Sequence, residues 1–210
     1  GLEQMEGLKQ IERHTLETPF GSPSSDLIEM GDGQRSILFL SRHGEDHAIP
    51  PHKVNYRANI WALKEMGVKQ VVAVAAIGGI TKAMLPGQVS IPNQIIDYTW
   101  GREHTFFDGP QVEHIDFSWP YCEALRTQLL QAASATGVNA VDGGTYGATQ
   151  GPRLESAAEI SRMEQDGCDI VGMTGMPEAG LARELELCYA CCAVSANWAA
   201  GKSEGEITME

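Results

Sequence analysis

The chain has 210 residues, of which 42% are hydrophobic and 20% charged, so that burial of apolar side chains can offset the entropy cost of folding. Its 28 acidic residues outnumber 15 basic ones and give a net charge of −13. This charge argues against a general nucleic-acid binder, which needs a broad basic face. The sequence has no run of about 18 apolar residues, which is the length that a transmembrane helix requires.

The cysteines and the first residues favour a cytoplasmic protein. The cysteines are an odd number, five, in a chain too long for a disulfide scaffold. We therefore expect buried, reduced thiols and no zinc site. The chain begins without the basic and then apolar segment of a secretory signal. The five residues are Cys122, Cys168, Cys188, Cys191 and Cys192.

The first half of the chain alternates apolar runs with one helical pattern. Residues 36–41 are typical of a buried strand, and residues 71–77 of a second one. Between these strands, apolar residues recur at helical spacing over residues 54–66, and Gly67 suits the end of that helix. Residues 89–96 resemble a strand that a proline interrupts.

The second half continues the alternation. The pattern predicts helices over residues 118–135, 154–165 and 177–186, and strands over residues 141–149, 168–172 and 187–196. Alternating strands and helices predict an α/β fold, a single domain over residues 1–210 with a central mixed sheet flanked by helices.

Polar residues follow the first predicted strand directly. An arginine fork such as that of Arg42, at the carboxyl end of a strand, suits an oxyanion such as phosphate. His43 comes next and adds a second candidate ligand. The alternative is a surface arginine that pairs with Glu45 or Asp46.

Two other strand ends offer contacts to an anion. Residues 75–79 are small, and small side chains let the backbone approach a ligand closely. Thr174 precedes a helix that Pro177 opens, where a hydroxyl and backbone N–H groups favour an anion. A tight turn and a simple helix cap explain the same residues without a ligand.

Glu155 and Asn197 follow two more predicted strands. A helix start explains the first residue and a turn the second, if each is taken alone. The ends of separate strands meet at one edge of an α/β sheet, and this convergence favours a binding site.

Taken together, these segments resemble the trimeric purine nucleoside phosphorylase family, most closely its 5′-methylthionucleoside branch. The similarity covers nearly the whole chain, with the motifs in the right order. Family members begin with a strand and a glycine-rich phosphate loop, and Gly1-Leu2 is similar to the end of that loop. The resemblance thus implies a nucleoside phosphorylase-like domain that lacks this first strand and a C-terminal helix. The motifs are Arg42-His43-Gly44, residues 54–65, Pro86-Gly87, Phe107-Asp108-Gly109, Gly151-Pro152-Arg153, Met173-Thr174 and Pro177-Glu178.

The resemblance implies phosphorolysis, in which phosphate attacks the anomeric carbon of a nucleoside and releases the purine. It also implies a homotrimer, inorganic phosphate as co-substrate, and no metal or organic cofactor. Met173 would pack under the ribose, and His114 of a neighbouring subunit would reach the 5′ pocket. The implied phosphate ligands are Arg42, His43, Thr174 and the backbone at Ala75 and Ala76.

The purine site departs from the methylthioadenosine pattern. Asn197 and Ala199 stand where adenine-selective members carry Asp, and Glu155 stands where they carry Ser. An Asn amide can donate to O6 of a 6-oxopurine while its carbonyl accepts from N7–H. A carboxylate accepts the N1–H of hypoxanthine but faces a bare lone pair on adenine. These residues predict that the base of the substrate is a 6-oxopurine.

The expected substrate is S-methyl-5′-thioinosine, because residues 51–59 and His114 match the methylthio branch. An inosine/guanosine phosphorylase, a methylthioadenosine phosphorylase and a non-catalytic purine-binding protein remain alternatives. An aromatic-rich stretch, residues 106–119, predicts a subunit interface. Residues 199–210 are small, polar and charged, and predict a loop that the purine orders.

Overall fold

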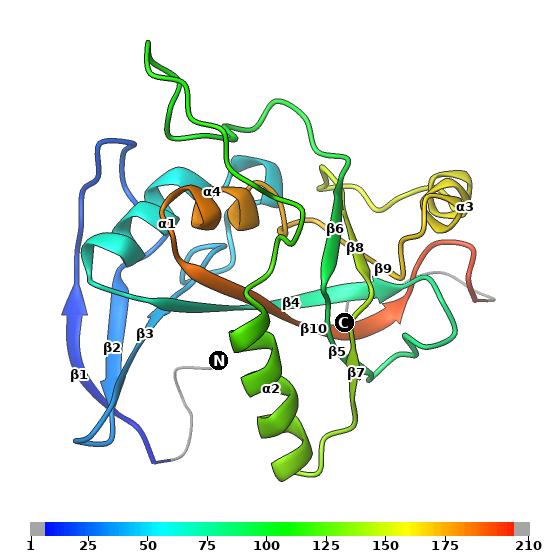
Figure 1. The fold of residues 1–210 in the computed structure, drawn as a ribbon, viewed down its shortest axis with the longest axis horizontal. Helices are drawn as coiled ribbons and strands as arrows, with labels where there is room; N and C mark the ends of the chain where they lie inside the picture. The colour runs from blue at the N-terminus through cyan, green and yellow to red at the C-terminus, as the bar shows by residue number, and fades with distance from the viewer. Residues whose placement is uncertain (1–6, 204–210) are drawn as a thin grey trace. The chain divides into compact units, whose positions relative to one another are not determined.

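The computed structural model describes residues 7–203, in two compact units that divide after Val68. The first unit is built on an antiparallel sheet with the order β1-β2-β3 (Figure 1). Its strands are β1 (Lys9–His14), β2 (Leu27–Gly31) and β3 (Ser36–Leu40). The expectations for Gly1-Leu2 and for residues 204–210 concern parts of the chain outside the described residues.

The predicted strand over residues 36–41 is present as β3, but its predicted burial is wrong. Ile37 is 44% exposed, and the other apolar residues of β3 are half-buried. The reason is position, since β3 lies at the end of a three-stranded sheet and not inside the large one. β1 and β2 were not anticipated, because charged residues interrupt both short segments.

The predicted helix over residues 54–66 is confirmed as α1 (Tyr56–Glu65), which follows the short 3-10 turn η2 (Pro51–Lys53). The Asn55 side chain accepts a hydrogen bond from the Ala58 backbone N–H and caps the helix. Asn59 is buried in the same helix, where its side chain accepts from the Ser24 N–H at 2.8 Å. These bonds hold the chain before β2 against the helix.

The second unit contains a seven-stranded mixed sheet with the order β6-β8-β9-β4-β10-β5-β7. β4 (Gln70–Gly79) and β10 (Cys188–Trp198) are its long parallel central pair, whereas β9 (Ile170–Gly172) is antiparallel to β4. This sheet confirms the predicted α/β fold with a mixed sheet flanked by helices. Burial on β4 alternates, with Ala73, Ala75 and Ile77 buried and Val72 and Val74 exposed, so the prediction of a fully buried strand was wrong.

Two predicted strands are each divided in two. Residues 89–96 form β5 (Val89–Ile91) and β6 (Gln94–Asp97), which lie toward opposite edges of the sheet. Residues 141–149 form β7 (Ala140–Asp142) and β8 (Thr145–Ala148). Gly143 and Gly144 separate them at φ of 92° and 103°, a region that favours glycine.

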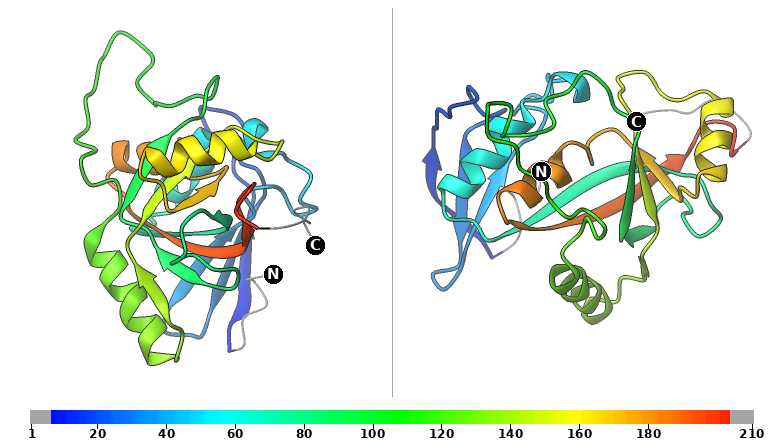
Figure 2. Two further views of the ribbon diagram at one scale, coloured as in Figure 1. Left: turned by 90° about the vertical axis from the view of Figure 1, so that its right-hand side faces the viewer. Right: turned by 45° about the horizontal axis from the view of Figure 1, so that its top comes forward.

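Three helices flank the sheet of this unit. They are α2 (Glu123–Ala135), α3 (Ala157–Gln165) and α4 (Glu178–Glu184), each shorter than predicted. α2 contacts β10, β7 and β5, and α4 contacts β10. Figure 2 shows α2 and α3 on opposite sides of the strands. None of the helices in the described part of the chain has the length and apolar character that crossing a membrane requires.

A disulfide joins Cys122 to Cys188, so the expectation of reduced thiols is wrong for this pair. The Cys122 N–H donates to the carbonyl of Tyr189 at 2.8 Å, and this bond brings the start of α2 beside the start of β10. Counting cysteines cannot reveal such a neighbour 66 positions away. Cys188 and Cys191 have the C-x-x-C spacing of some zinc sites, but residues three apart on a strand face opposite sides.

Candidate active site

The predicted phosphate ligands Arg42 and His43 follow β3 in the first unit. The carbonyl of Ile49 can only accept, so the His43 Nδ1 at 2.8 Å carries the proton. The Ile49 N–H donates back to the carbonyl of His43 at 2.9 Å, and these two bonds close the loop and orient the imidazole. Glu45, one alternative partner for Arg42, forms an ion pair with Arg13.

The small residues Ala75 and Ala76 lie within β4 in the second unit, and this strand continues to Gly79, so the predicted end of the strand at residue 77 is wrong. β4 pairs with β10 along its whole length, but with β9 only at Gly78 and Gly79. Ala75 is buried and Ala76 is exposed, so the two methyl groups point to opposite faces of the sheet.

A β-bulge sets the direction of Asn197. Ser195 pairs with Ile77, whereas Asn197 pairs with Gly78, so Ala196 is one extra residue in β10. Paired residues on parallel strands share a face, and Asn197 consequently lies on the face of Ala76 and Gly78. Without the extra residue, Asn197 would have followed Ser195 onto the opposite, buried face.

Glu155 lines a cavity of about 310 Å³ in the second unit. Its Oε1 accepts a hydrogen bond from the Thr149 hydroxyl at 2.7 Å. Thr149 is itself buried, and its N–H donates to the carbonyl of Gly172 at 2.8 Å, so the end of β9 helps to hold the carboxylate. Other residues of the lining are Tyr98, Trp100, Gln150, Gly151 and Arg153.

Met173 and Thr174 follow β9 directly. A Cβ at Gly151 would lie 2.4 Å from the Sδ of Met173, so only glycine lets the thioether lie against this wall of the cavity. Thr174 is 8% exposed. The helix expected over residues 177–186 begins at Glu178 with Pro177 as its N-cap, so Thr174 precedes the helix without capping it. The alternative explanation of Thr174 as a simple helix cap is therefore wrong.

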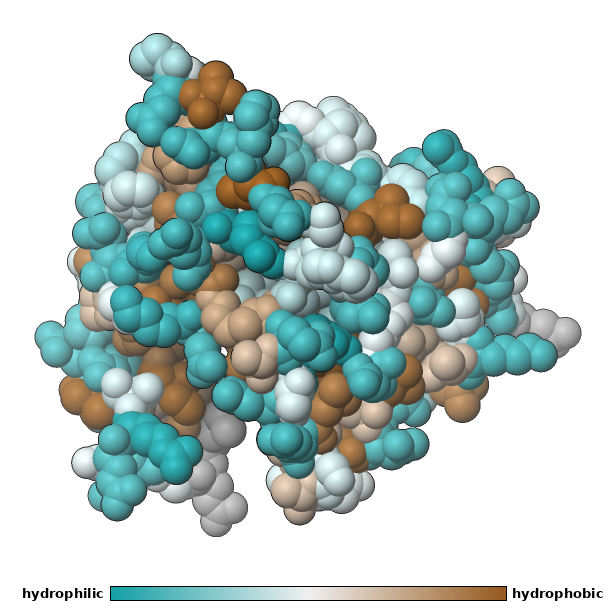
Figure 3. Space-filling model, viewed as in Figure 1, coloured by the Kyte–Doolittle hydropathy of each residue, from teal (hydrophilic) through white to brown (hydrophobic). Residues whose placement is uncertain are grey.

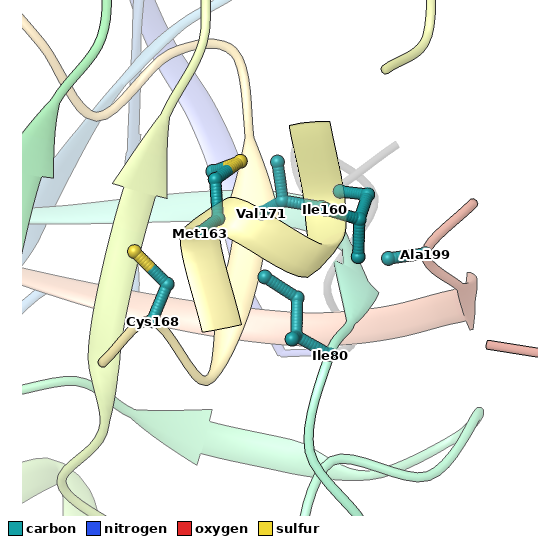
Figure 4. Close-up of a cluster of buried hydrophobic side chains, with 6 residues drawn as sticks. All are labelled: Ile80, Ile160, Met163, Cys168, Val171 and Ala199. Atoms are coloured by element: carbon teal, nitrogen blue, oxygen red, sulfur yellow. The ribbon is translucent and has the colours of Figure 1, made fainter. Parts of the chain in front are cut away.

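Ala199 packs in an apolar cluster, where its methyl group is buried with side chains from α3 and β9 (Figure 4). The Ala199 N–H donates to the carbonyl of Gly79 at 2.9 Å. Gly78 permits this approach, because a Cβ there would lie 3.3 Å from the Ala199 Cα. The cluster comprises Ile80, Ile160, Met163, Cys168, Val171 and Ala199.

His114 is exposed on the long segment between β6 and α2, which extends far from the sheet (Figure 1). This segment and its ends carry the most exposed apolar side chains of the unit: Trp100 and Val112 are each 70% exposed, and Trp119 is 69% exposed. Figure 3 shows apolar side chains emerging among polar ones on this part of the surface.

Arg102 is a residue that the sequence analysis missed. Its guanidinium donates to four backbone carbonyls, two after β8 and two after β9. A single arginine between a strand and a loop carries no periodic or motif signal. Its role becomes visible only from these hydrogen bonds to segments far away in the sequence.

The structure thus brings together Glu155, Thr149 and Gly151 around one cavity, places Met173 against Gly151, and turns Asn197 to the face of Ala76. Arg42 and His43 belong to the first unit, and their convergence with Thr174 on one phosphate stays a prediction.

Comparison with known proteins finds relatives that are named as phosphorylases. The profile of the phosphorylase superfamily matches residues 1–210. A "probable S-methyl-5′-thioinosine phosphorylase" of Pseudomonas syringae is 57% identical over 212 residues, which cover 100% of this chain and 86% of that protein. A "6-oxopurine nucleoside phosphorylase" of Pyrococcus furiosus is 47% identical, covering 92% of this chain and 75% of that one. The structure of a methylthioadenosine phosphorylase from an antarctic soil metagenomic library superposes with a TM-score of 0.95 at 35% identity, covering 99% of this chain and 74% of that one.

Proposed function

This chain belongs to the phosphorylase superfamily, and we propose that it cleaves S-methyl-5′-thioinosine with phosphate. The products are hypoxanthine and 5-methylthioribose 1-phosphate, which places the enzyme in purine salvage. The observation that carries the proposal is the Glu155 carboxylate, held by Thr149 at the wall of the cavity. A carboxylate there accepts the N1–H that hypoxanthine has and adenine lacks.

Asn197 adds the second base contact. The bulge turns it to the same sheet face as Ala76, whose amide is the backbone donor that we assign to phosphate. The Asn197 amide group donates to O6 and its carbonyl accepts from N7–H. The relatives named S-methyl-5′-thioinosine phosphorylase support the same base and the same 5′ substituent.

The chemistry asks the protein to position an anion under a carbon that becomes positive. Arg42, His43 and Thr174 bind the phosphate, and Met173 packs under the ribose. As the glycosidic bond breaks, negative charge grows on the purine, and the Asn197 N–H stabilises it at O6. Hydrogen phosphate gives up a proton as its oxygen bonds to the sugar, and the purine takes up a proton at N7, so that neutral hypoxanthine leaves and the Asn197 carbonyl accepts from N7–H. We assign no metal and no organic cofactor to this reaction, because phosphate is the nucleophile and the purine is the leaving group.

A second candidate is an inosine/guanosine phosphorylase. Glu155 and Asn197 are assigned contacts with the base and none with the 5′ group, so they would bind inosine equally well. A relative named 6-oxopurine nucleoside phosphorylase, at 47% identity, supports this candidate.

The deciding experiment compares S-methyl-5′-thioinosine, methylthioadenosine, inosine and guanosine, each with and without phosphate. We expect the highest kcat/KM for S-methyl-5′-thioinosine and no turnover without phosphate. Faster cleavage of inosine and guanosine would establish the second candidate. Preference for methylthioadenosine would overturn the base assignment, and release of purine without phosphate would indicate a hydrolase.

We also propose a homotrimer, in which His114 of one subunit reaches the 5′ pocket of its neighbour. The exposed Trp100, Val112 and Trp119 support it, since such side chains are commonly covered in an assembly.

As the compartment we propose the cytoplasm, where the Cys122–Cys188 disulfide would be unusual. Blocking thiols in intact cells before lysis tests this: a Cys188 that is labelled in the cell fits a cytoplasmic protein, and a protected one contradicts it.

A further inference from the structure

We propose that Arg102 is a positioning residue that holds the base-recognising wall and the sugar- and phosphate-binding wall of the site in register. This role rests on the function proposed above. Arg102 itself is not assigned a contact with substrate; it acts through the segments that carry Glu155, Met173 and Thr174.

The bonds of Arg102 use all three nitrogens of its guanidinium, which offers five N–H donors in a planar fork. Nη1 donates to the carbonyls of Met173 at 2.9 Å and Met176 at 2.6 Å. Nη2 donates to the carbonyls of Thr149 at 3.1 Å and Gln150 at 2.8 Å. Nε donates to the side-chain Oε1 of Gln150 at 3.2 Å.

These acceptors lie where the sheet no longer orders the backbone. β8 ends at Ala148 and β9 at Gly172, so the carbonyls lie just beyond both strands. Thr149 hydrogen-bonds Glu155, and Met173 lies against Gly151. One cation therefore sets the distance between the segment that reads the base and the segment that holds ribose and phosphate.

The side chain of Gln150 extends this network to the loop that carries Arg102. Its Oε1 also accepts from the Trp100 N–H at 3.1 Å, and both Trp100 and Gln150 line the cavity. The planar fork is essential to this arrangement, because a lysine offers three donors from one point and cannot reach two pairs of carbonyls.

Arg126 supplies a matched control. It is 4% exposed in the same unit and donates to the carbonyls of Pro92 at 3.0 Å and Ile91 at 3.2 Å, as well as to the carboxylates of Glu123 and Asp142. It thus resembles the half-buried Arg102 as a bridge between backbone segments, but the segments it joins carry no site residue that we assign.

The experiment compares Arg102→Lys with Arg126→Lys. For each variant, kcat/KM is measured for S-methyl-5′-thioinosine and for methylthioadenosine. Calorimetry measures the binding of hypoxanthine and of adenine, and thermal unfolding measures stability. We expect Arg102→Lys to lower kcat/KM for the 6-oxopurine substrate about 10- to 100-fold, because a misplaced site loses rate steeply. We also expect it to reduce the preference for hypoxanthine over adenine, in catalysis and in binding, by about fivefold or more, as the Glu155 contact weakens. Arg126→Lys should lower stability and leave this preference unchanged.

An Arg102→Lys protein that is folded and keeps its preference within about twofold would overturn the inference. So would an equal loss of preference in Arg126→Lys, since that would make the effect a general loss of structure. If Arg102→Lys does not fold, Gln150→Leu removes the acceptor of Nε and of the Trp100 N–H, and it must reduce the preference in the same direction. Adding guanidinium ion to Arg102→Ala should restore part of the lost rate. A wild-type protein that fails to cleave any of the four nucleosides with phosphate would instead defeat the proposed function.

Discussion

Asn197 shows how the direction of one side chain depends on a single inserted residue. The bulge at Ala196 moves Asn197 from the buried face of Ser195 to the face of Ala76. Bulges near functional sites commonly re-aim a side chain in this way. The residue type predicts which purine the Asn197 side chain can hydrogen-bond, while the bulge decides on which face of the sheet this side chain lies.

We predict that Asn197→Asp moves the preference from 6-oxopurine toward 6-aminopurine nucleosides by about tenfold, which corresponds to about 1.4 kcal/mol. A carboxylate cannot donate to O6, whereas it accepts from an amino group. The kcat/KM ratio of S-methyl-5′-thioinosine to methylthioadenosine measures the change. Asn139→Asp, at an exposed position before β7, is the control for added charge. An unchanged ratio in Asn197→Asp would refute the base assignment.

Ala199 lies in an apolar neighbourhood that does not suit a carboxylate. We predict that Ala199→Asp lowers the free energy of unfolding by about 2–5 kcal/mol, because it places a carboxylate in the cluster of Ile160 and Val171. Urea unfolding at neutral pH measures the loss. Ala196→Asp, at the exposed bulge position, should cost far less. Equal stability of both variants would show that Ala199 borders the polar site instead.

At the scale of elements, α3 closes one side of the cavity and depends on its first turn. Ser156 and Glu159 form a reciprocal capping box, in which each side chain accepts from the other residue's N–H. Arg153 binds Glu159 through both terminal nitrogens, at 2.9 and 2.8 Å. The hydrogen bond from Arg153, followed by the one from the Ser156 backbone, lowers the pKa of Glu159 to about 2.

This shift predicts a pH dependence of stability. The folded pKa of about 2 lies below the ordinary value of 4.5, so the ionised Glu159 stabilises the protein above pH 4.5 and loses this effect as pH falls toward 2. The stability difference between the wild type and Glu159→Gln should therefore shrink over this range. Glu113→Gln, which alters an exposed glutamate on the long loop, serves as the control. A constant difference from pH 6 to about 2 would contradict the assignment.

At the scale of the whole molecule, the Cys122–Cys188 disulfide closes a long loop. The sequence separation is 66 residues, and a loop of this length restricts the unfolded chain by about 4 kcal/mol in the entropy model. We predict that dithiothreitol lowers the melting temperature of the wild type and leaves that of Cys122→Ser unchanged. Cys192→Ser, which removes a free thiol, keeps the response to the reductant. Identical melting of wild type with and without reductant would show that the bond does not form in solution.

The assembly is the last property to test. We predict that light scattering of the wild type gives the mass of about three chains, because the exposed aromatic residues of the long loop are covered by a neighbour. Trp119→Ser should weaken the assembly and the activity together. Val138→Ser, an exposed apolar residue after α2, should change neither. A monomer with full activity would contradict both the assembly and the role of His114.

The sequence by itself determined the class of fold and predicted the chemistry of the site. The spacing of apolar residues and the capping residues lie within each segment of the chain, so α1, β4 and β10 could be predicted from their own sequences. The residue types at Glu155 and Asn197 pointed to a 6-oxopurine, because hydrogen-bonding capacity belongs to the side chain itself. Motif order added the family, which the relatives confirm.

Only the tertiary structure decided what depends on contacts between distant segments. Residues 89–96 split between two edges of the sheet, and Cys122 met Cys188, because partners elsewhere in the chain set both outcomes. Arg102 had no local signal, since its meaning lies in carbonyls about 50 and 70 positions away. Long-range geometry of this kind is absent from residue type and spacing, because it exists only once the strands that carry the acceptors have paired.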